Sequence, residues 1–527
     1  MTVVAVPPTA GIRKWWALSG LSLAVLAVSL DATVLSVALP TLAGSLKASA
    51  SDLQWFVSSY TLALAIGLLP GGLLGDRFGR KRMMIIALAM FGLSSLACGY
   101  APNPAVFIAA RTLLGLSAGF MIPLVISVVA VMFSEQELPK ALAVWGGANF
   151  LGLPVGPILG GWLLSHYWWG WVFLMNLPVV LIGLLAVATL VPESRASKTP
   201  GLDPIGAVTS CVGLAVLIYG FIAAGQYGWT SVTAIVSMVA GLAILVVFVV
   251  WERSLSRRPE TQPLVDLNLF RSARFTWGTI LQAFGVFAMF GLLFAVPQFL
   301  QAIRGVDAMG SGLRLLPLLG GLAVGAGLAS VGVKWLTAKL TAALGFAVLA
   351  AGLVLGTTMS ADTGDALIAV WTAIAGLGFG LVLATAASAA LVDLPKENAG
   401  VGSAVMQAVQ KAGAPLSAAV LGSVLASGYR SQLHLADLPA GVASAVRGSV
   451  FAGIGVANQA RSDSLLASVR SSFVHGIDLM LWVGVGVSVI GVALSLVFLP
   501  WKVVAATKSA GAEMVVEGGE FARERAA

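Results

Sequence analysis

The sequence predicts an all-α polytopic membrane protein, and three features lead to this fold class. Of its 527 residues, 58% are hydrophobic and 10% are charged, with a mean hydropathy of +0.96, whereas soluble domains carry roughly a quarter charged residues. Apolar runs of about 20 residues, long enough to cross a bilayer as helices, follow one another along the chain. Most of the Lys and Arg residues lie in alternate loops, as in loops that stay in the cytoplasm.

About fourteen apolar runs can be delimited by length and hydropathy. An even count that starts inside places both termini in the cytoplasm. The runs fall into groups of about six, two and six, and paired six-span halves are typical of transporters. In chain order they are 15–38, 53–74, 83–100, 105–132, 141–164, 171–191, then 204–224 and 231–251, then 275–300, 313–332, 338–359, 366–391, 401–427 and 476–499.

The predicted organisation follows from these groups. An N-terminal six-helix bundle occupies 1–192, two additional spans occupy 193–260, and a C-terminal six-helix bundle occupies 261–500. A cytoplasmic tail covers 501–527. The long external loop 428–472 has a composition that suits short helices lying on the outer surface, although a tolerated insertion explains it equally well.

Composition excludes several classes of function. The net charge of +8 follows from loop bias, so we expect no nucleic-acid partner. Cys98 and Cys211 lie inside apolar runs, and no Cys/His spacing typical of a metal site is present. Neither H-E-x-x-H nor a pair of intramembrane aspartates occurs. We therefore expect a protein that is not an enzyme and that uses no cofactor or metal.

A charged loop joins the second and third runs. The stretch 71–82, GGLLGDRFGRKR, places four cations beside one acid between two membrane-length segments. Glycines there allow two helix ends to approach closely. The residues of this stretch that are candidates for a mechanical role are Gly72, Asp76, Arg77, Gly79 and Arg80. The alternative is that the charges only fix the topology.

Asp31 and Arg111 are ionisable residues that we place inside spans, which makes each a functional candidate. Asp31 lies about seven residues, roughly 10 Å, from the outer end of the first span. Arg111 lies about as far from the outer end of the fourth, so the two can meet at one depth. Low dielectric favours the neutral carboxyl and a nearby cation favours the ionised one. Such a site can load and release a proton, or it can be a static ion pair.

A glycine repeat marks the fifth span. In GLPVGPILGG, residues 152–161, Gly152, Gly156 and Gly160 recur every four residues and share one helix face, with Pro157 and Gly161 beside them. A stripe of small residues lets a neighbouring helix pack backbone to backbone. Either a special interface or an ordinary packing face is compatible with it.

Other polar or aromatic residues inside the apolar runs are candidates for a substrate cavity. Lys411 lies near the middle of its span, where it either acts as a cavity cation that disfavours dicationic compounds or is neutral. The full set is Tyr60, Trp145, Asn149, Gln282, Phe287, Gln407 and Lys411.

These motifs resemble those of the fourteen-span drug:proton antiporter family of the major facilitator superfamily. The stretch 71–82 resembles its G-x-L-x-D-R-x-G-R-K loop, and 152–161 matches G-x-x-x-G-P-x-x-G-G at every specified position. The stretch 30–40 resembles L-D-x-T-V-V-N-V-A-L-P, with Ser36 for Asn. The stretch 111–119 resembles R-x-x-Q-G-x-G, with Leu114 for Gln and Ser117 for the second Gly. The stretch 169–178 resembles W-R-W-x-F-x-x-N-x-P, with Gly170 for Arg.

The resemblance implies a major facilitator fold, two six-helix bundles plus two extra central spans. It implies a role for Arg111 in proton coupling, a latch at the charged loop, and a motif at 152–161 that belongs to antiporters and lies between the two halves. The expected function is proton-driven export of amphiphilic drugs or antibiotics across the cytoplasmic membrane by a monomer, with the proton gradient as energy source. The alternative is export of one endogenous metabolite, antibiotic or lipid.

Overall fold

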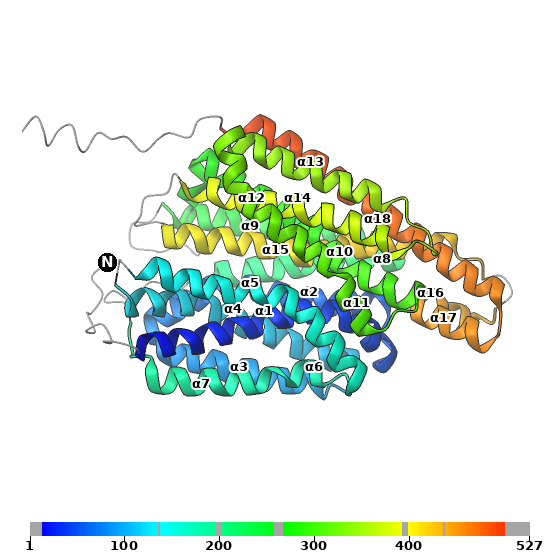
Figure 1. Ribbon diagram of the computed structural model, residues 1–527, viewed down its shortest axis with the longest axis horizontal. Helices are drawn as coiled ribbons and strands as arrows, with labels where there is room; N and C mark the ends of the chain where they lie inside the picture. The colour runs from blue at the N-terminus through cyan, green and yellow to red at the C-terminus, as the bar shows by residue number, and fades with distance from the viewer. Residues whose placement is uncertain are drawn as a thin grey trace, which may run out of the picture.

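The computed structural model describes residues 13–134, 137–195, 203–257, 267–392, 399–435 and 438–500, and within them every regular element is a helix. Two helical bundles lie side by side, and a hairpin of two further helices packs behind them (Figure 1). Each bundle has its own buried apolar core. The predicted all-α class is therefore confirmed.

The N-terminal bundle is built from helices whose ends follow local signals. Ser49 and Asp52 form a reciprocal capping box at the start of the second helix, and Asn103 caps the fourth. The elements are α1 (Arg13–Ser45), α2 (Ala50–Phe78), α3 (Arg80–Gly99), α4 (Pro104–Met132), α5 (Leu138–His166), α6 (Trp171–Leu174) and α7 (Asn176–Leu190).

The C-terminal bundle follows a helical hairpin formed by α8 (Pro204–Tyr227) and α9 (Val232–Leu255). Its elements are η1 (Leu267–Arg271), α10 (Ala273–Gln298), the π-helical η2 (Phe299–Ile303), α11 (Ala308–Arg314), α12 (Leu316–Leu336), α13 (Ala338–Gly356), α14 (Asp365–Val392), α15 (Ala399–Gln432), α16 (Ala440–Gly448), α17 (Val450–Gln459) and α18 (Asp463–Phe498).

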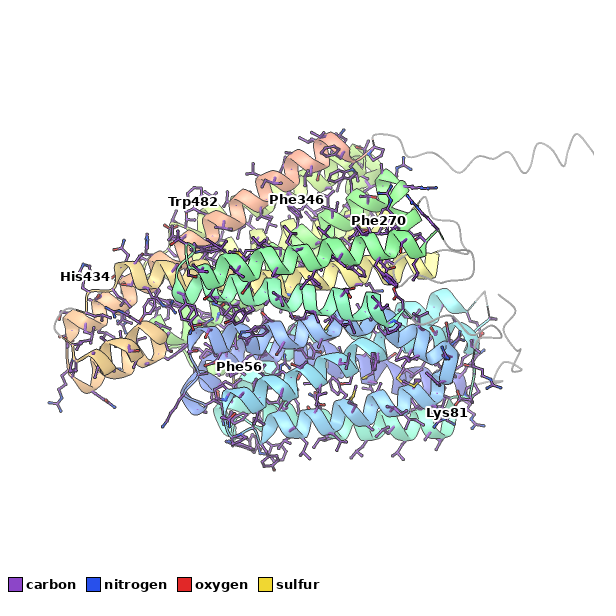
Figure 2. All side chains as sticks on the ribbon, turned by 180° about the vertical axis from the view of Figure 1, so that it is seen from behind. Phe56, Lys81, Phe270, Phe346, His434 and Trp482 are labelled. Atoms are coloured by element: carbon purple, nitrogen blue, oxygen red, sulfur yellow. The ribbon has the colours of Figure 1, made fainter. Side chains whose placement is uncertain are left out.

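Twelve helical segments of the described residues are long and apolar enough to cross a membrane, and the bent α2 brings the number to thirteen. The predicted fourteen is compatible with this, because α5 adds a further helix of 29 residues. α1 begins and α18 ends on the side of the molecule opposite α16 and α17, as an even number of crossings requires (Figure 1). Figure 2 shows Lys81 and His434 at these two opposite ends.

The two bundles meet in the half of the molecule that carries α16 and α17. Gly161 of α5 lies against α11, where a Cβ would come 2.6 Å from Met309 Cα. The Gln301 side chain of η2 donates a hydrogen bond to the Val37 carbonyl of α1, with N and O 2.9 Å apart. The bundles are therefore joined at this end.

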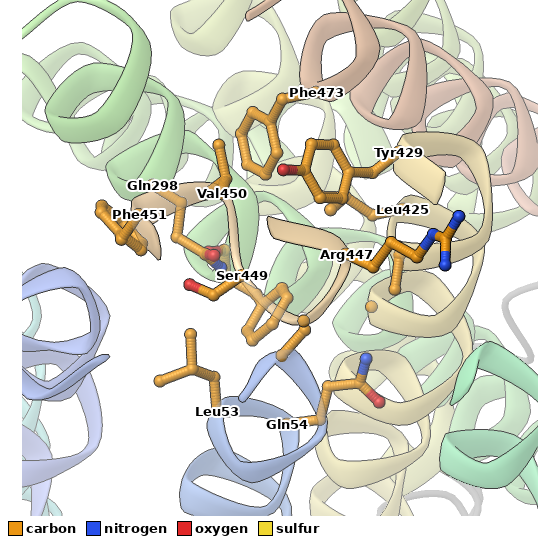
Figure 3. A pocket seen from close by; sticks show the side chains of 15 residues that line it. Leu53, Gln54, Gln298, Leu425, Tyr429, Arg447, Ser449, Val450, Phe451 and Phe473 are labelled. Carbon is orange, nitrogen blue, oxygen red and sulfur yellow. The ribbon is translucent and has the colours of Figure 1, made fainter. Parts of the chain in front are cut away.

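The segment predicted as an external loop forms two short helices, and α15 and α18 extend into it from either side. Phe451 of α17 packs against the cores of both bundles. The Tyr429 hydroxyl donates to the Val446 carbonyl at 2.9 Å and ties α15 to α16. Figure 3 shows the pocket under these helices, where Leu53 and Gln54 of α2 face Tyr429 and Phe473. The α16–α17 segment thus covers the junction of the bundles.

Single cysteines test the orientation of this fold. In a chain with Cys98 and Cys211 replaced by Ala, we introduce Ala440→Cys or Arg82→Cys, both at exposed positions at opposite ends. We expect a membrane-impermeant maleimide to label position 440 in intact cells and position 82 only after permeabilisation, because cationic loops stay inside. The reverse pattern would invert the orientation, and equal labelling of both would contradict the crossing count.

Candidate functional site

A buried ion pair lies at the centre of the N-terminal bundle. Arg111 of α4 donates from Nη1 to Asp31 Oδ2 of α1 at 2.5 Å. The Asp31 side chain is 0% exposed and that of Arg111 is 1% exposed. The structure thus brings together the two residues that the sequence placed at one depth.

Two further contacts hold Arg111. Its Nε donates to the Phe56 carbonyl of α2 at 3.2 Å, and its guanidinium lies 4.1 Å from the centre of the Tyr60 ring. The Tyr60 hydroxyl in turn donates to the Val28 carbonyl of α1 at 3.3 Å. Gly115 of α4 lies so close to the Tyr60 backbone that no side chain would fit there. The close approach of α2 and α4 therefore places a carbonyl and a ring face on the cation.

The second oxygen of Asp31 faces α7. Asn176 donates from Nδ2 to Asp31 Oδ1 at 3.4 Å and to Ser95 Oγ of α3 at 2.9 Å. The Ser95 hydroxyl donates to the Phe173 carbonyl of α6 at 2.8 Å. The Asp31 carboxyl is thus bound by one charged and one neutral side chain.

The glycine stripe of α5 faces α1, the helix that carries Asp31. A Cβ at each of its positions would collide with a side chain one turn or less from Asp31, and Thr33 Oγ1 donates to the Gly152 carbonyl at 3.3 Å. The pairs are Gly152 with Ser29, Gly156 with Thr33, and Gly160 with Val34. The stripe therefore packs within the N-terminal bundle.

Another side of α5 meets the second bundle. A Cβ on Gly312 of α11 would collide with the Pro157 carbonyl, and Gly161 lies against the backbone of Ala308 and Met309. Ser165 also donates to Asp307 at 3.3 Å. Two faces of the 152–161 motif thus serve two interfaces, one to α1 and one across the bundles.

The charged loop is held within its own bundle. Arg80 binds Asp76 through Nε and Nη2, at 2.9 and 2.8 Å. Gly79 has φ of 106°, a conformation that disfavours any side chain, and a Cβ there would come 2.7 Å from Glu193. The Arg80 amide donates to the Ser194 carbonyl at 2.8 Å. Gly72 lies near Pro123 of α4, and Arg77 is exposed beside the Phe78 ring.

The cavity candidates do not gather in one pocket of the described residues. Tyr60 lies beneath Arg111, and Trp145 packs on the edge of the N-terminal core. In α10, Gln282 donates to the Leu383 carbonyl at 3.4 Å and Phe287 packs on the C-terminal core. Gln407 is half-buried in α15. The side chains of Asn149 and Lys411 lie outside the described residues.

Sequence reasoning missed several residues around the site. Asn176 was not among the candidates, although it occupies the Asn position of the family motif that the stretch 169–178 resembles, and this match could have identified it. Glu193 carried no signal, because its contact with the charged loop is made only in the folded bundle. Glu252 in α9 and Asp478 in α18 are further acids in spanning helices, near the ends of the predicted spans.

Gly115–Gly119 reads GLSAG, the spacing of a hydrolase nucleophile elbow, which sequence inspection overlooked. The stretch lies in the middle of α4 rather than at a strand-to-helix turn. The Ser117 hydroxyl donates to the Leu113 and Leu114 carbonyls at 2.9 and 2.8 Å. This serine is therefore bound within its own helix.

Two helical bundles joined at one end, with a buried ion pair in one of them, define a multi-pass membrane transporter. The sequence matches the Major Facilitator Superfamily over residues 21–211 and 204–418, and the chain belongs to that family. A bacterial homologue of the human lysosomal transporter Spinster, in an inward-facing and unoccupied conformation, has the same fold, with a TM-score of 0.67 and 15% identity over 92% of this chain and 97% of that one.

Curated relatives cover most of this chain. The tetracenomycin C resistance and export protein of Streptomyces glaucescens is 31% identical over 94% of this chain and 93% of its own. The multidrug efflux pump LfrA of Mycolicibacterium smegmatis is 31% identical over 88% and 92%. The puromycin resistance protein pur8 of Streptomyces alboniger is 32% identical over 83% and 86%.

The α1–α5 contact makes a prediction about Gly156. A Cβ there collides with Thr33 Oγ1 and comes 3.1 Å from the Leu30 carbonyl, so Gly156→Leu must push α1 and its Asp31 away from α5. We expect a loss of about 1–3 kcal/mol of stability, as is typical of overpacking, and loss of export with normal insertion. Export, membrane abundance and melting temperature measure this.

Val155→Leu is the matched control, because Val155 is 40% exposed on the same helix. It should leave export and melting temperature unchanged. Full export by a Gly156→Leu protein of normal melting temperature would refute the requirement for close packing of α1 and α5.

Proposed function

We propose that this chain is a proton-coupled exporter of amphiphilic drugs or antibiotics, working as a monomer in the cytoplasmic membrane with both termini in the cytoplasm. The observation that carries the proposal is the Asp31–Arg111 pair, which is excluded from solvent inside a bundle of spanning helices. Ionisable residues at such depth are costly and mark proton or substrate pathways. The resistance and export relatives support drugs as the cargo.

The carboxyl is the group that carries the proton. Protonation of Asp31 neutralises the partner of Arg111 and leaves a buried cation with only a carbonyl and a ring face. An unpaired buried charge is strongly unfavourable, so each protonation state favours a different arrangement of α1 and α4. A proton can shift the balance between two conformations only through such a difference in free energy.

The route from the proton site to the bundle junction runs through α1 and α5. Asp31 lies within the segment 29–34 of α1, other residues of which contact the α5 glycines, and Pro157 and Gly161 of α5 touch α11 of the other bundle. A movement of α1 is therefore transmitted to the contact between α5 and α11. This contact must open when the two bundles rotate relative to each other during transport. The observed junction, closed at the α16–α17 end, supports an inward-facing state.

The second candidate is a dedicated exporter of one endogenous compound. The relative named for tetracenomycin C resistance and export favours this possibility, since its name gives a single antibiotic. Both candidates use the same fold and the same proton site, and they differ in the range of cargo.

Growth inhibition distinguishes the two candidates. We express the chain in a bacterium that lacks its own efflux pumps and measure inhibitory concentrations for puromycin, ethidium and a wide panel of cationic and neutral amphiphiles. Several-fold protection against unrelated compounds indicates a multidrug exporter, and protection confined to one chemical class indicates a dedicated one. No protection together with no export of any compound from inverted vesicles would refute drug export.

Substitution of the ion pair tests proton coupling. We expect Asp31→Asn to lose uphill export driven by a pH gradient in proteoliposomes while exchange down a substrate gradient persists, because Asn mimics the neutral carboxyl. Asp31→Glu should keep partial activity. If the pair is only structural, Asp31→Asn leaves Arg111 unpaired at a cost of about 3–5 kcal/mol, and the double change with Arg111→Gln recovers the melting temperature.

Transport and melting are therefore measured on the same purified variants. A stable Asp31→Asn protein without pH-driven export supports the proton carrier. Full pH-driven export by that variant would refute the assignment of Asp31 as the proton carrier.

A further inference from the structure

Asn176 is a buried residue that the proton mechanism above does not use. It is 1% exposed and is the first residue of α7, where the chain resumes a helix after the break at Met175. Pro178 contributes to this break, because it cannot donate to the carbonyl of Leu174. The break turns α6 and α7 into separate helices.

The hydrogen bonds of Asn176 converge on the proton site. Its Nδ2 donates to Asp31 Oδ1 at 3.4 Å and to Ser95 Oγ at 2.9 Å, and Ser95 in turn is fixed by the Phe173 carbonyl. The α3 hydroxyl thus holds the amide from one side, and the Asp31 carboxyl binds it on the other. Its amide is oriented by two neighbouring helices, α3 and α1.

The other end of the same amide is an unused acceptor. Among the described residues, no donor makes a hydrogen bond to Asn176 Oδ1, although this atom is buried. A buried polar atom without a partner is unfavourable and requires an explanation. A protonated Asp31 would supply the missing donor, because rotation of the amide about its side-chain bond exchanges Nδ2 for Oδ1 and presents Oδ1 to the carboxyl O–H.

We propose that Asn176 is a positioning residue for proton exchange at Asp31, donating to the ionised carboxyl and accepting from the protonated one. This inference rests on the proposed function, in which Asp31 is the proton carrier. In this arrangement Arg111 is the partner of the ionised Asp31 carboxyl only. Asn176 can bind both states without moving its backbone.

The strength of the Asn176 hydrogen bond in the two protonation states of Asp31 predicts the direction in which removal of the amide shifts the titration. Hydrogen bonds to a charged group are stronger than those between neutral groups, so Asn176 favours the ionised carboxyl overall. The other charged or titratable side chains near Asp31 are Arg111 of α4, Tyr60 of α2 and Cys98 of α3, and all three remain in the variants below. Removal of the amide should let Asp31 keep its proton to higher pH.

Infrared titration of the purified chain tests this without any drug. The C=O stretch of a protonated carboxyl is separate from that of a carboxylate, and the band lost in Asp31→Asn belongs to Asp31. We expect Asn176→Leu to raise the pH midpoint of this band by about one unit. Asn176→Ala removes the amide without adding volume and should raise the midpoint in the same direction if the Leu variant does not fold.

Two controls separate positioning from general packing. Gln298→Leu removes another buried amide, one that donates to the Phe294 carbonyl of α10 at 2.8 Å, and should leave the midpoint unchanged. Ser95→Ala keeps the contact between Asn176 and Asp31 and should move the midpoint less than Asn176→Leu. An unchanged or lower midpoint in folded Asn176→Leu or Asn176→Ala protein would overturn the inference.

Failure of the inference is distinguishable from failure of the proposed function. If Asp31 titrates and both Asn176 variants move its midpoint while proteoliposomes show no pH-driven export, the positioning role stands and proton-coupled export fails. If export depends on pH through Asp31 while the midpoint ignores Asn176, export stands and the positioning role fails.

Discussion

The fully buried pair of Asp31 and Arg111 is the constraint around which the N-terminal bundle is arranged. Transfer of a single ion of this size into a dry interior costs of order 20 kcal/mol in the ideal limit, and attraction between two ions offsets this only when the remaining hydrogen-bonding groups are satisfied. A carbonyl of α2, a ring face and an amide of α7 supply those partners. The carbonyl and the ring face require α2 to approach α4 closely, which explains Gly115 on α4.

Much of this arrangement could be predicted from the sequence, because the signals are local. Length and hydropathy delimit the spans, and the bias of Lys and Arg in the loops predicts their orientation in the membrane. Asp31 and Arg111 are conspicuous because a charge within an apolar run is rare. Their depth, counted in residues from the helix ends, was enough to predict that they could meet, and the structure joins them at 2.5 Å.

The partners of the pair could not be predicted in the same way. The Phe56 carbonyl is a backbone group that any residue would supply, and only the crossing of α2 and α4 selects it. The glycine stripe shows that a helix approaches α5, yet a period of four residues does not say which one. In the structure, Gly156 of α5 lies against α1 and Gly161 of α5 lies against α11, so adjacent faces of one motif serve different interfaces. Glu193 contacts the charged loop from 112 residues away in the sequence.

The hairpin of α8 and α9 shows why the type of contact matters as much as its position. Polar contacts attach α8 to the C-terminal bundle, since Ser423 of α15 donates to the Phe221 carbonyl at 2.6 Å and Arg430 donates to the Gln226 carbonyl at 2.8 Å. Apolar side chains, among them Leu62 of α2 and Ile222 of α8, form its contact with the N-terminal bundle. Apolar packing is non-directional, whereas a hydrogen bond weakens steeply when its geometry changes. The surface against α2 can therefore slide at lower cost than the attachment to α15, and bundle rocking is compatible with an extra hairpin that moves with the C-terminal half.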